Sequence, residues 1–179
     1  MKPIYKYLST KIKNLKIKAT DETIRQIVKD ELDRLGHNAD LNHIDTSKVT
    51  DMNHLFSCHD FYLGSKHEDL NPDISKWNVS NVKDMSHMFC FCKKFNQDLS
   101  EWDMSKVENM DSMFWKCIQF NCNISGWDVK NVKDMAFMFY YCKKFNQDLS
   151  QWNVEKVKDA RFIFENCYIK EEFKPKFNI

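Results

Sequence analysis

One phrase occurs twice in this sequence. Residues 92–102 read CKKFNQDLSEW and residues 142–152 read CKKFNQDLSQW, so the two phrases differ at a single position. Four tryptophans mark the underlying period at intervals of 25 residues: Trp77, Trp102, Trp127 and Trp152. No unit of this length can bury its own large apolar side chains, so the units must stack on one another. The repeat therefore decides which folds are open to the chain.

Other apolar positions keep the same period, and we call each set of equivalent positions a column. Columns beginning at Val82, Met85, Phe89, Cys92 and Phe95 recur through the later units. An earlier, degenerate unit is eight residues longer, and its extra length falls between Cys58 and Asn71. We count five units, which begin near Leu41, Ile74, Leu99, Ile124 and Leu149.

Two periodicities alternate within one unit. Residues 74–82 (ISKWNVSNV) suit a short strand and a turn, with apolar side chains separated by polar ones. Residues 84–92 (DMSHMFCFC) place apolar side chains at spacings that predict one stripe of a short helix. An Asp or Asn stands before that stripe in every unit, where it could cap the helix: Asp51, Asp84, Asn109, Asp134 and Asp159. Another such column precedes each strand: Asp40, Asp73, Asp98, Asn123 and Asp148.

These patterns predict an α/β solenoid of about five strand-turn-helix coils. We expect residues 1–40 to form a basic segment and a capping helix, and residues 41–168 to form the solenoid. Its units are 41–73, 74–98, 99–123, 124–148 and 149–168, and residues 169–179 form a C-terminal cap with Phe173 and Phe177 over the last coil. The capping helix is expected between Thr20 as its N-cap and Gly36 as its C-cap, with an apolar stripe of Ile24, Ile27, Val28, Leu32 and Leu35. Ahead of it, residues 12–18 suit a strand or a loose basic arm.

The repeat also resembles the BspA-type leucine-rich repeat. The resemblance covers about residues 41–168 and rests on the step MFxxC and on phrases such as FNQDLSEWDMSKV and FNCNISGWDVKNV. It implies a right-handed parallel solenoid with strands on one face, helices on the other, and a surface used for binding rather than for chemistry. Many relatives resemble secreted or lipid-anchored surface proteins, so a surface adhesin is one alternative function.

The first residues do not support that alternative. They contain no apolar core of a signal peptide, and no apolar run approaches the roughly 20 residues that span a bilayer. We therefore expect a cytoplasmic protein without membrane contact, whose seven cysteines are reduced thiols.

The residue types give no sign of catalysis, a cofactor or a metal. One cysteine per coil forms a line, whereas a zinc site needs four converging ligands. His54 and Cys58, with His59 and His67 nearby, are best interpreted as polar surface. With three glycines in the whole chain, no phosphate-binding loop is available. The repeated carboxylates Asp45, Asp103 and Asp128 share one environment, while acid/base catalysis needs two different ones.

Candidate binding residues are those that vary between units, since inward positions repeat. The positions flanking the inward stripe include large aromatic residues, of which we select Trp115, Phe137, Tyr140 and Tyr141. Partly exposed aromatic side chains are typical anchors for a protein partner, although they could also be ordinary side packing. A second candidate surface on the strand face carries Glu101, Asp103 and Asp128 opposite several lysines.

We therefore expect a non-enzymatic module that docks a protein partner, such as an intracellular inhibitor or adaptor. The identity of the partner and the oligomeric state remain open. The alternative of nucleic-acid binding rests on residues 1–18, which carry a charge of +6 and leave −5 for the remaining residues, since the whole chain carries +1. The lysines assigned to that alternative are Lys11, Lys13, Lys16 and Lys18.

Overall fold

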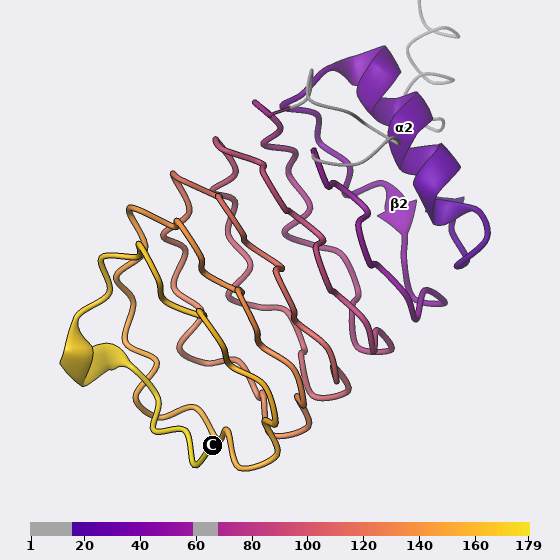
Figure 1. The fold of residues 1–179 in the computed structure, drawn as a ribbon. Helices are drawn as coiled ribbons and strands as arrows, with labels where there is room; N and C mark the ends of the chain where they lie inside the picture. Colours follow the sequence, from indigo (N-terminus) through magenta and orange to yellow (C-terminus); the bar gives the residue numbers. More distant parts are fainter. Residues whose placement is uncertain (1–15, 59–67) are drawn as a thin grey trace, which may run out of the picture.

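Successive 25-residue units lie side by side as a stack of loops, with α2 at the N-terminal end (Figure 1). The structure is a computed structural model, and it describes residues 16–58 and 68–179. Its regular elements are β1 (Ile17–Lys18), α2 (Ile24–Leu35), β2 (Ile44–Asp45) and the 3₁₀ helix η2 (Glu171–Phe173). The predictions that involve Lys11, Lys13, His59 and His67 fall outside the described residues.

Backbone hydrogen bonds join each loop to the next in the same register. The amide of Met85 donates to the Asn109 carbonyl at 3.0 Å, and one unit later the amide of Met110 donates to the Asp134 carbonyl at 2.9 Å. Parallel bridges connect the Asp/Asn column through all the units: Asp51 with Asp84, Asp84 with Asn109, Asn109 with Asp134, and Asp134 with Asp159. The 25-residue period is therefore the spacing of one complete loop.

The short helix predicted in each unit is wrong. In the second unit, residues 85–92 form successive tight turns, in which Met88 donates to the Met85 carbonyl at 3.2 Å and Cys92 donates to the Phe89 carbonyl at 2.9 Å. Within each of these turns one residue adopts a left-handed φ value, 56° at His87 and 66° at Phe91. The amides of Met85, His87, Phe89 and Phe91 donate to the next unit, so they cannot close a helix. Among the described residues, α2 is the only α-helix, and the units are joined by single bridges rather than by long strands.

Each unit bends at three Asp or Asn side chains, which cap turns. For the second unit these are Asp73, which directly precedes it, and Asn78 and Asp84 within it; their side-chain oxygens accept the amide two residues later, at 3.0, 3.1 and 2.8 Å respectively. The two predicted Asp/Asn columns are thus capping residues, but of Asx-turns rather than of helices. These turns let the loop change direction with side-chain oxygens in place of glycines.

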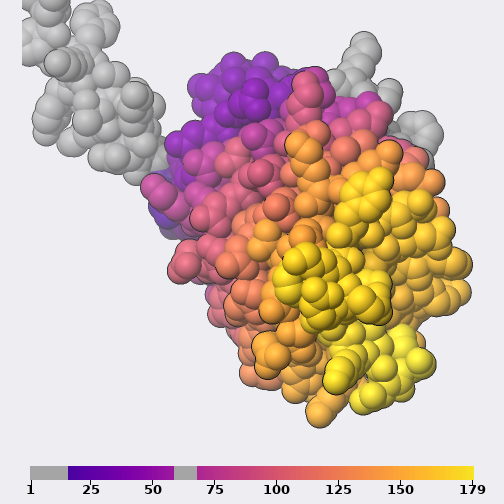
Figure 2. All heavy atoms as spheres, turned by 90° about the vertical axis from the view of Figure 1, so that its left-hand side faces the viewer, coloured from indigo at the N-terminus to yellow at the C-terminus, as the bar shows by residue number. Residues whose placement is uncertain are grey.

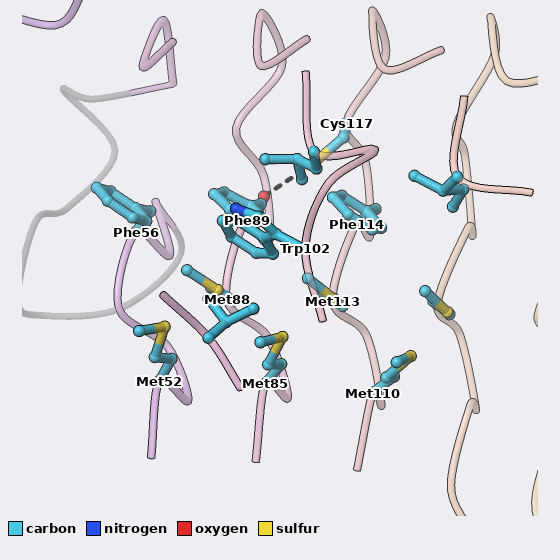
Figure 3. Close-up of a cluster of buried hydrophobic side chains, with 14 of the residues drawn as sticks. Met52, Phe56, Met85, Met88, Phe89, Trp102, Met110, Met113, Phe114 and Cys117 are labelled. Carbon is cyan, nitrogen blue, oxygen red and sulfur yellow. Dashed lines mark hydrogen bonds between the residues drawn. The ribbon is translucent and has the colours of Figure 1, made fainter. Parts of the chain in front are cut away.

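The core consists of files of identical side chains that run along the stack. The rings of Phe56, Phe89, Phe114 and Phe139 follow one another at centroid distances of 5.5, 5.5 and 5.8 Å, and Figure 3 shows the first three. Each repeat tryptophan is buried, and its indole N–H donates to a carbonyl of the preceding unit, as Trp127 does to Leu99 at 3.0 Å. Each repeat tryptophan therefore contributes to the core and also joins its unit to the preceding one by a hydrogen bond.

The cysteine column has a second role beyond filling space. The Sγ atoms of Cys92, Cys117 and Cys142 lie 3.0, 3.0 and 2.9 Å from the carbonyl oxygens of Phe56, Phe89 and Phe114. Figure 3 shows the contact between Cys117 and Phe89. A thiol is small, largely apolar and able to donate, so it satisfies a buried carbonyl without adding bulk.

Alkylation should separate the seven free thiols into two classes. Cys58, Cys90, Cys92, Cys117 and Cys142 are buried, whereas Cys122 and Cys167 are partly exposed. Burial raises the pKa of Cys167 to about 11, so its reactive thiolate fraction should rise about tenfold per pH unit between pH 8 and 10. We expect iodoacetamide to modify only Cys122 and Cys167 in the native protein, at rates that rise with pH, and all seven in urea, as measured by mass spectrometry. Rapid native modification of Cys92 or Cys117 would contradict this packing.

The N-terminal end of the stack is covered by α2 and β1. Ile24, Val28 and Leu32 are buried, but Leu35 is 44% exposed, so its predicted place on the inward stripe is wrong. The predicted C-cap is confirmed, because Gly36 has a φ of 86° and its amide donates to the Leu32 carbonyl. The predicted N-cap is displaced: Thr20 forms the turn before the helix, and its carbonyl accepts the amide of Ile24 at 2.9 Å. Beside this helix, β1 pairs in parallel with β2 of the first unit.

The opposite end is formed by the last unit and the residues that follow it, which face the viewer in Figure 2. The Phe173 carbonyl accepts the amide of Leu149 at 2.8 Å. Phe173 and Phe177 are partly buried against the core, where they were expected.

Candidate functional site

The aromatic residues flanking the inward stripe gather on the outside of the stack. We call this set the aromatic stripe: Phe91, Trp115, Phe137, Tyr140, Tyr141 and Phe162. The ring centroid of Trp115 lies 5.5 Å from that of Phe91, 5.9 Å from that of Phe137 and 5.8 Å from that of Tyr140. Phe137 continues the contact to Phe162 at 5.1 Å, and Tyr140 to Tyr141 at 4.8 Å. The stripe is thus continuous across four neighbouring units.

The backbone holds several of these side chains in a conformation that bulky residues rarely adopt. The φ values of Phe91, Phe137, Tyr141 and Phe162 lie between 55° and 66°, in the left-handed region. Such residues cost about 1 kcal/mol or more each, and they persist where the surrounding structure imposes them. His87 and Ser112 occupy equivalent positions with φ values of 56° and 55° in other units, so an aromatic ring is not needed to form the turn.

Trp115 has an unusual environment within the stripe. Its Nε1 atom is buried, and no hydrogen-bond acceptor reaches it in the described part of the chain. An unpaired buried donor costs about 1–3 kcal/mol, so an indole is a costly choice if packing is its only role. The repeat tryptophans in the core, by contrast, all donate to a carbonyl.

The structure brings together the four predicted aromatic residues, each of them partly exposed. It adds two residues that the sequence interpretation did not select, Phe91 and Phe162, and Phe162 is the most exposed of the six at 54%. Both lie in the same columns as Tyr141 and Phe137, so the periodicity contained the information that identifies them.

The predicted acidic residues lie elsewhere, at the bends beside the repeat tryptophans: Glu101 directly precedes Trp102, whereas Asp103 and Asp128 directly follow a tryptophan. Glu101, Asp103 and Asp128 are all exposed. Asp103 accepts the amide of Ser105 at 3.0 Å, and Asp128 forms an ion pair with Lys130 at 2.6 Å. These contacts lower the pKa of both carboxyl groups, through Ser105 for Asp103 and through Lys130 for Asp128. The two aspartates therefore shape turns, and part of their charge is already matched within the chain.

A shallow hollow of about 320 Å³ lies beside the same bends, and the sequence interpretation missed it. Its charged lining consists of Lys83, Lys106, Lys133, Lys156 and Glu108. The four lysines belong to two different columns, so no single column reveals the group.

The described lysines of the basic arm are on β1 and next to it. Lys16 and Lys18 are exposed and lie near Asp45, whose pKa is lowered chiefly by hydrogen bonds from Ser47 and further by these two lysines. Part of their positive charge therefore faces a carboxylate of the first unit.

The histidines of the first units pair with each other and with an acid. The rings of His54 and His87 stack at 4.4 Å, and Nε2 of His87 lies 3.2 Å from an Asp111 carboxylate oxygen. Within residues 16–58 and 68–179, no three His, Cys, Asp or Glu side chains are grouped as metal ligands would be. In the same ranges, no helix has the length and apolar character to cross a bilayer.

Comparison with known proteins places the chain in a family. No curated protein and no solved structure matches it. A family model, described as a Mycoplasma protein of unknown function, DUF285, matches residues 23–65 and 58–176. The match covers the stack and all of α2, and BspA-like repeats characterise that family. The chain is a member of the DUF285 family.

Proposed function

We propose that this protein is a non-enzymatic, BspA-like leucine-rich-repeat module that docks another protein on its aromatic stripe. The observation that carries the proposal is the contact of six aromatic side chains on the outer surface, over four units whose inward positions repeat. The buried columns account for the packing between units without these residues. Packing of the core therefore does not explain why the stripe is aromatic.

The chemistry of the stripe suits a protein partner. Tyrosine and tryptophan present a large apolar area with few rotatable bonds, and they are enriched among the residues that dominate binding energy. Lys116 lies over the ring of Phe91, with its ammonium 4.3 Å from the centroid, and adds a polar margin to the apolar surface. An apolar centre with a polar rim is the usual composition of a protein interface.

The competing explanation is that the rings only buttress neighbouring units. Contacts between aromatic side chains contribute about 0.5–1.5 kcal/mol beyond their buried area, which is a real structural benefit. Under that explanation, truncation of the stripe would lower stability and leave binding untouched. Under ours, truncation of two solvent-accessible rings of the stripe lowers affinity far more than stability.

Affinity capture with a double variant, Tyr140→Ala/Phe162→Ala, tests the proposal. Any protein retained by the unaltered chain should be retained at least tenfold less well by this variant, since exposed aromatic anchors are often worth 2 kcal/mol or more, about 30-fold in affinity. The matched control is Asp103→Lys/Asp128→Lys, which alters the other predicted surface. Equal retention by both variants, with unfolding temperatures unchanged, would exclude the stripe as the docking surface.

A further inference from the structure

We infer that the hollow lined by Lys83, Lys106, Lys133 and Lys156 is a separate binding site for an extended acidic segment of a protein. We call it the lysine hollow. It is formed by residues on either side of the valine column, away from the aromatic stripe, and the inference does not depend on the proposed docking surface.

The four lysines form a zigzag along the stack, one from each of four successive units. Lys83 and Lys133 directly follow a buried valine, whereas Lys106 and Lys156 directly precede one. Since neighbouring chains in a ladder lie about 5 Å apart, lysines of the same column are about 10 Å apart and consecutive lysines are closer. The result is a linear row of ammonium groups rather than a cluster.

Most of this positive charge is unmatched. Lys133 forms an ion pair with Glu108. Lys106 and Lys156 donate instead to the neutral amide oxygens of Asn81 and Asn131, each at 2.7 Å. In the described ranges, no carboxylate oxygen lies within 4.0 Å of the ammonium groups of Lys83, Lys106 or Lys156. The hollow therefore carries three more positive charges than negative ones.

The asparagines also fix where two of the ammonium groups stand. Ordering a lysine side chain costs up to about 2 kcal/mol of rotamer entropy. Because the contacts with Asn81 and Asn131 already order these two side chains, part of that cost is met before a ligand binds. The contacts leave two of the three N–H donors of each ammonium group for an anion.

Glu108 shows that the hollow accepts a carboxylate. Its pKa is lowered by the hydrogen bond from Lys133, by the charge of Lys133 and then by the charges of Lys83 and Lys156. One carboxylate thus already occupies part of the row. Carboxylates on every second residue of an extended peptide are about 6.6 Å apart, a spacing that a zigzag of lysines can follow.

Two features favour an acidic peptide over nucleic acid. No aromatic side chain lines the hollow, so unpaired bases would have nothing to stack on. Carboxylates also border the row: Asp103 lies near Lys106, while Asp84 and Asp134 directly follow Lys83 and Lys133 in the chain. These borders repel a wide polyanion such as a duplex, but they leave room for a single narrow strand.

Fluorescence anisotropy with a labelled decapeptide of alternating Glu and Ser tests the site on the full chain. We expect saturable binding that weakens with salt and is absent for the matched Gln-Ser peptide. Lys106→Gln/Lys156→Gln should weaken binding at least tenfold, while Lys76→Gln/Lys144→Gln, which removes the same charge elsewhere on the surface, should change it less than twofold.

A gain-of-affinity variant guards against effects of misfolding. Glu108→Gln removes the carboxylate that competes inside the hollow, and it should tighten peptide binding at least threefold. The inference is overturned if the Glu-Ser peptide does not bind, or if the two lysine double variants weaken binding equally. It is also overturned if a single-stranded oligothymidylate of equal charge binds as tightly as the peptide, because the site would then select phosphate rather than acidic protein.

Discussion

Replacement of Phe114 by alanine is expected to lower the free energy of unfolding by about 3–5 kcal/mol. The side chain is fully buried, and its ring lies 5.5 Å from that of Phe89, 3.9 Å from that of Phe120 and 5.8 Å from that of Phe139. Its removal opens a cavity between three units, and the turns on either side are fixed by ladder hydrogen bonds that limit collapse.

Urea denaturation followed by tryptophan fluorescence measures this effect. Phe114→Leu is the conservative control and should cost clearly less, because most of the volume is kept. In a stack, each unit contacts only its neighbours, so a weak middle unit should also broaden the transition or divide it in two. A loss below about 1 kcal/mol for Phe114→Ala would mean that the phenylalanine file is not a principal source of stability.

Deletion of one complete unit should leave a folded, shorter protein, whereas deletion of half a unit should abolish cooperative unfolding. Without residues 99–123, the amide of Met85 would face the Asp134 carbonyl, in the place that the Asn109 carbonyl occupies now. The Sγ of Cys142 would likewise meet the Phe89 carbonyl in place of the Phe114 carbonyl. Every column then continues, and the chain loses the contribution of one unit.

Deletion of residues 99–111 brings different columns against each other. With a period of 25 residues, Phe89 would face Trp127 in place of Phe114, and the Trp127 indole would lose its acceptor, the Leu99 carbonyl, which is deleted. Circular dichroism and thermal melting compare the two deletions directly. If both gave equally unfolded protein, identical units would not be interchangeable and the stack would depend on features specific to each one.

The sequence predicted the register of the stack well, because register depends on the period alone. The buried Trp, Phe and Cys columns follow from a strict recurrence of large apolar side chains, and all of them face inward in the structure. The helix in each unit was wrongly predicted for a physical reason. Side chains spaced as Met85, Met88, Phe89 and Cys92 share one side of a helix, and they also share one side of a pair of tight turns. A helix and a pair of tight turns differ in the hydrogen-bond partners of their amides. In this protein those partners lie in the next unit, so the local sequence does not reveal them.

The candidate surfaces were predictable to different degrees. Trp115, Phe137, Tyr140 and Tyr141 could be selected because they are large aromatic side chains in columns that vary between units. The lysine hollow could not, because Lys83 and Lys106 belong to different columns and share one row only after the units are stacked. The net charge of the whole chain, +1, also gives no sign of the local excess of lysines in the hollow.

The ladder between units has a direction. At the turns that carry the inward stripe, amides of the earlier unit, such as Phe89, donate to carbonyls of the later unit, such as Met113; beside the valine column the direction reverses, and Glu108 donates to the Lys83 carbonyl. At the turns of the inward stripe the two ends of the stack therefore present different backbone groups. The first unit offers acceptors, and Arg25 of α2 donates to one of them, the Asn53 carbonyl, at 2.9 Å. At the same turns the last unit offers amide donors, which a covering segment would have to meet with carbonyl oxygens.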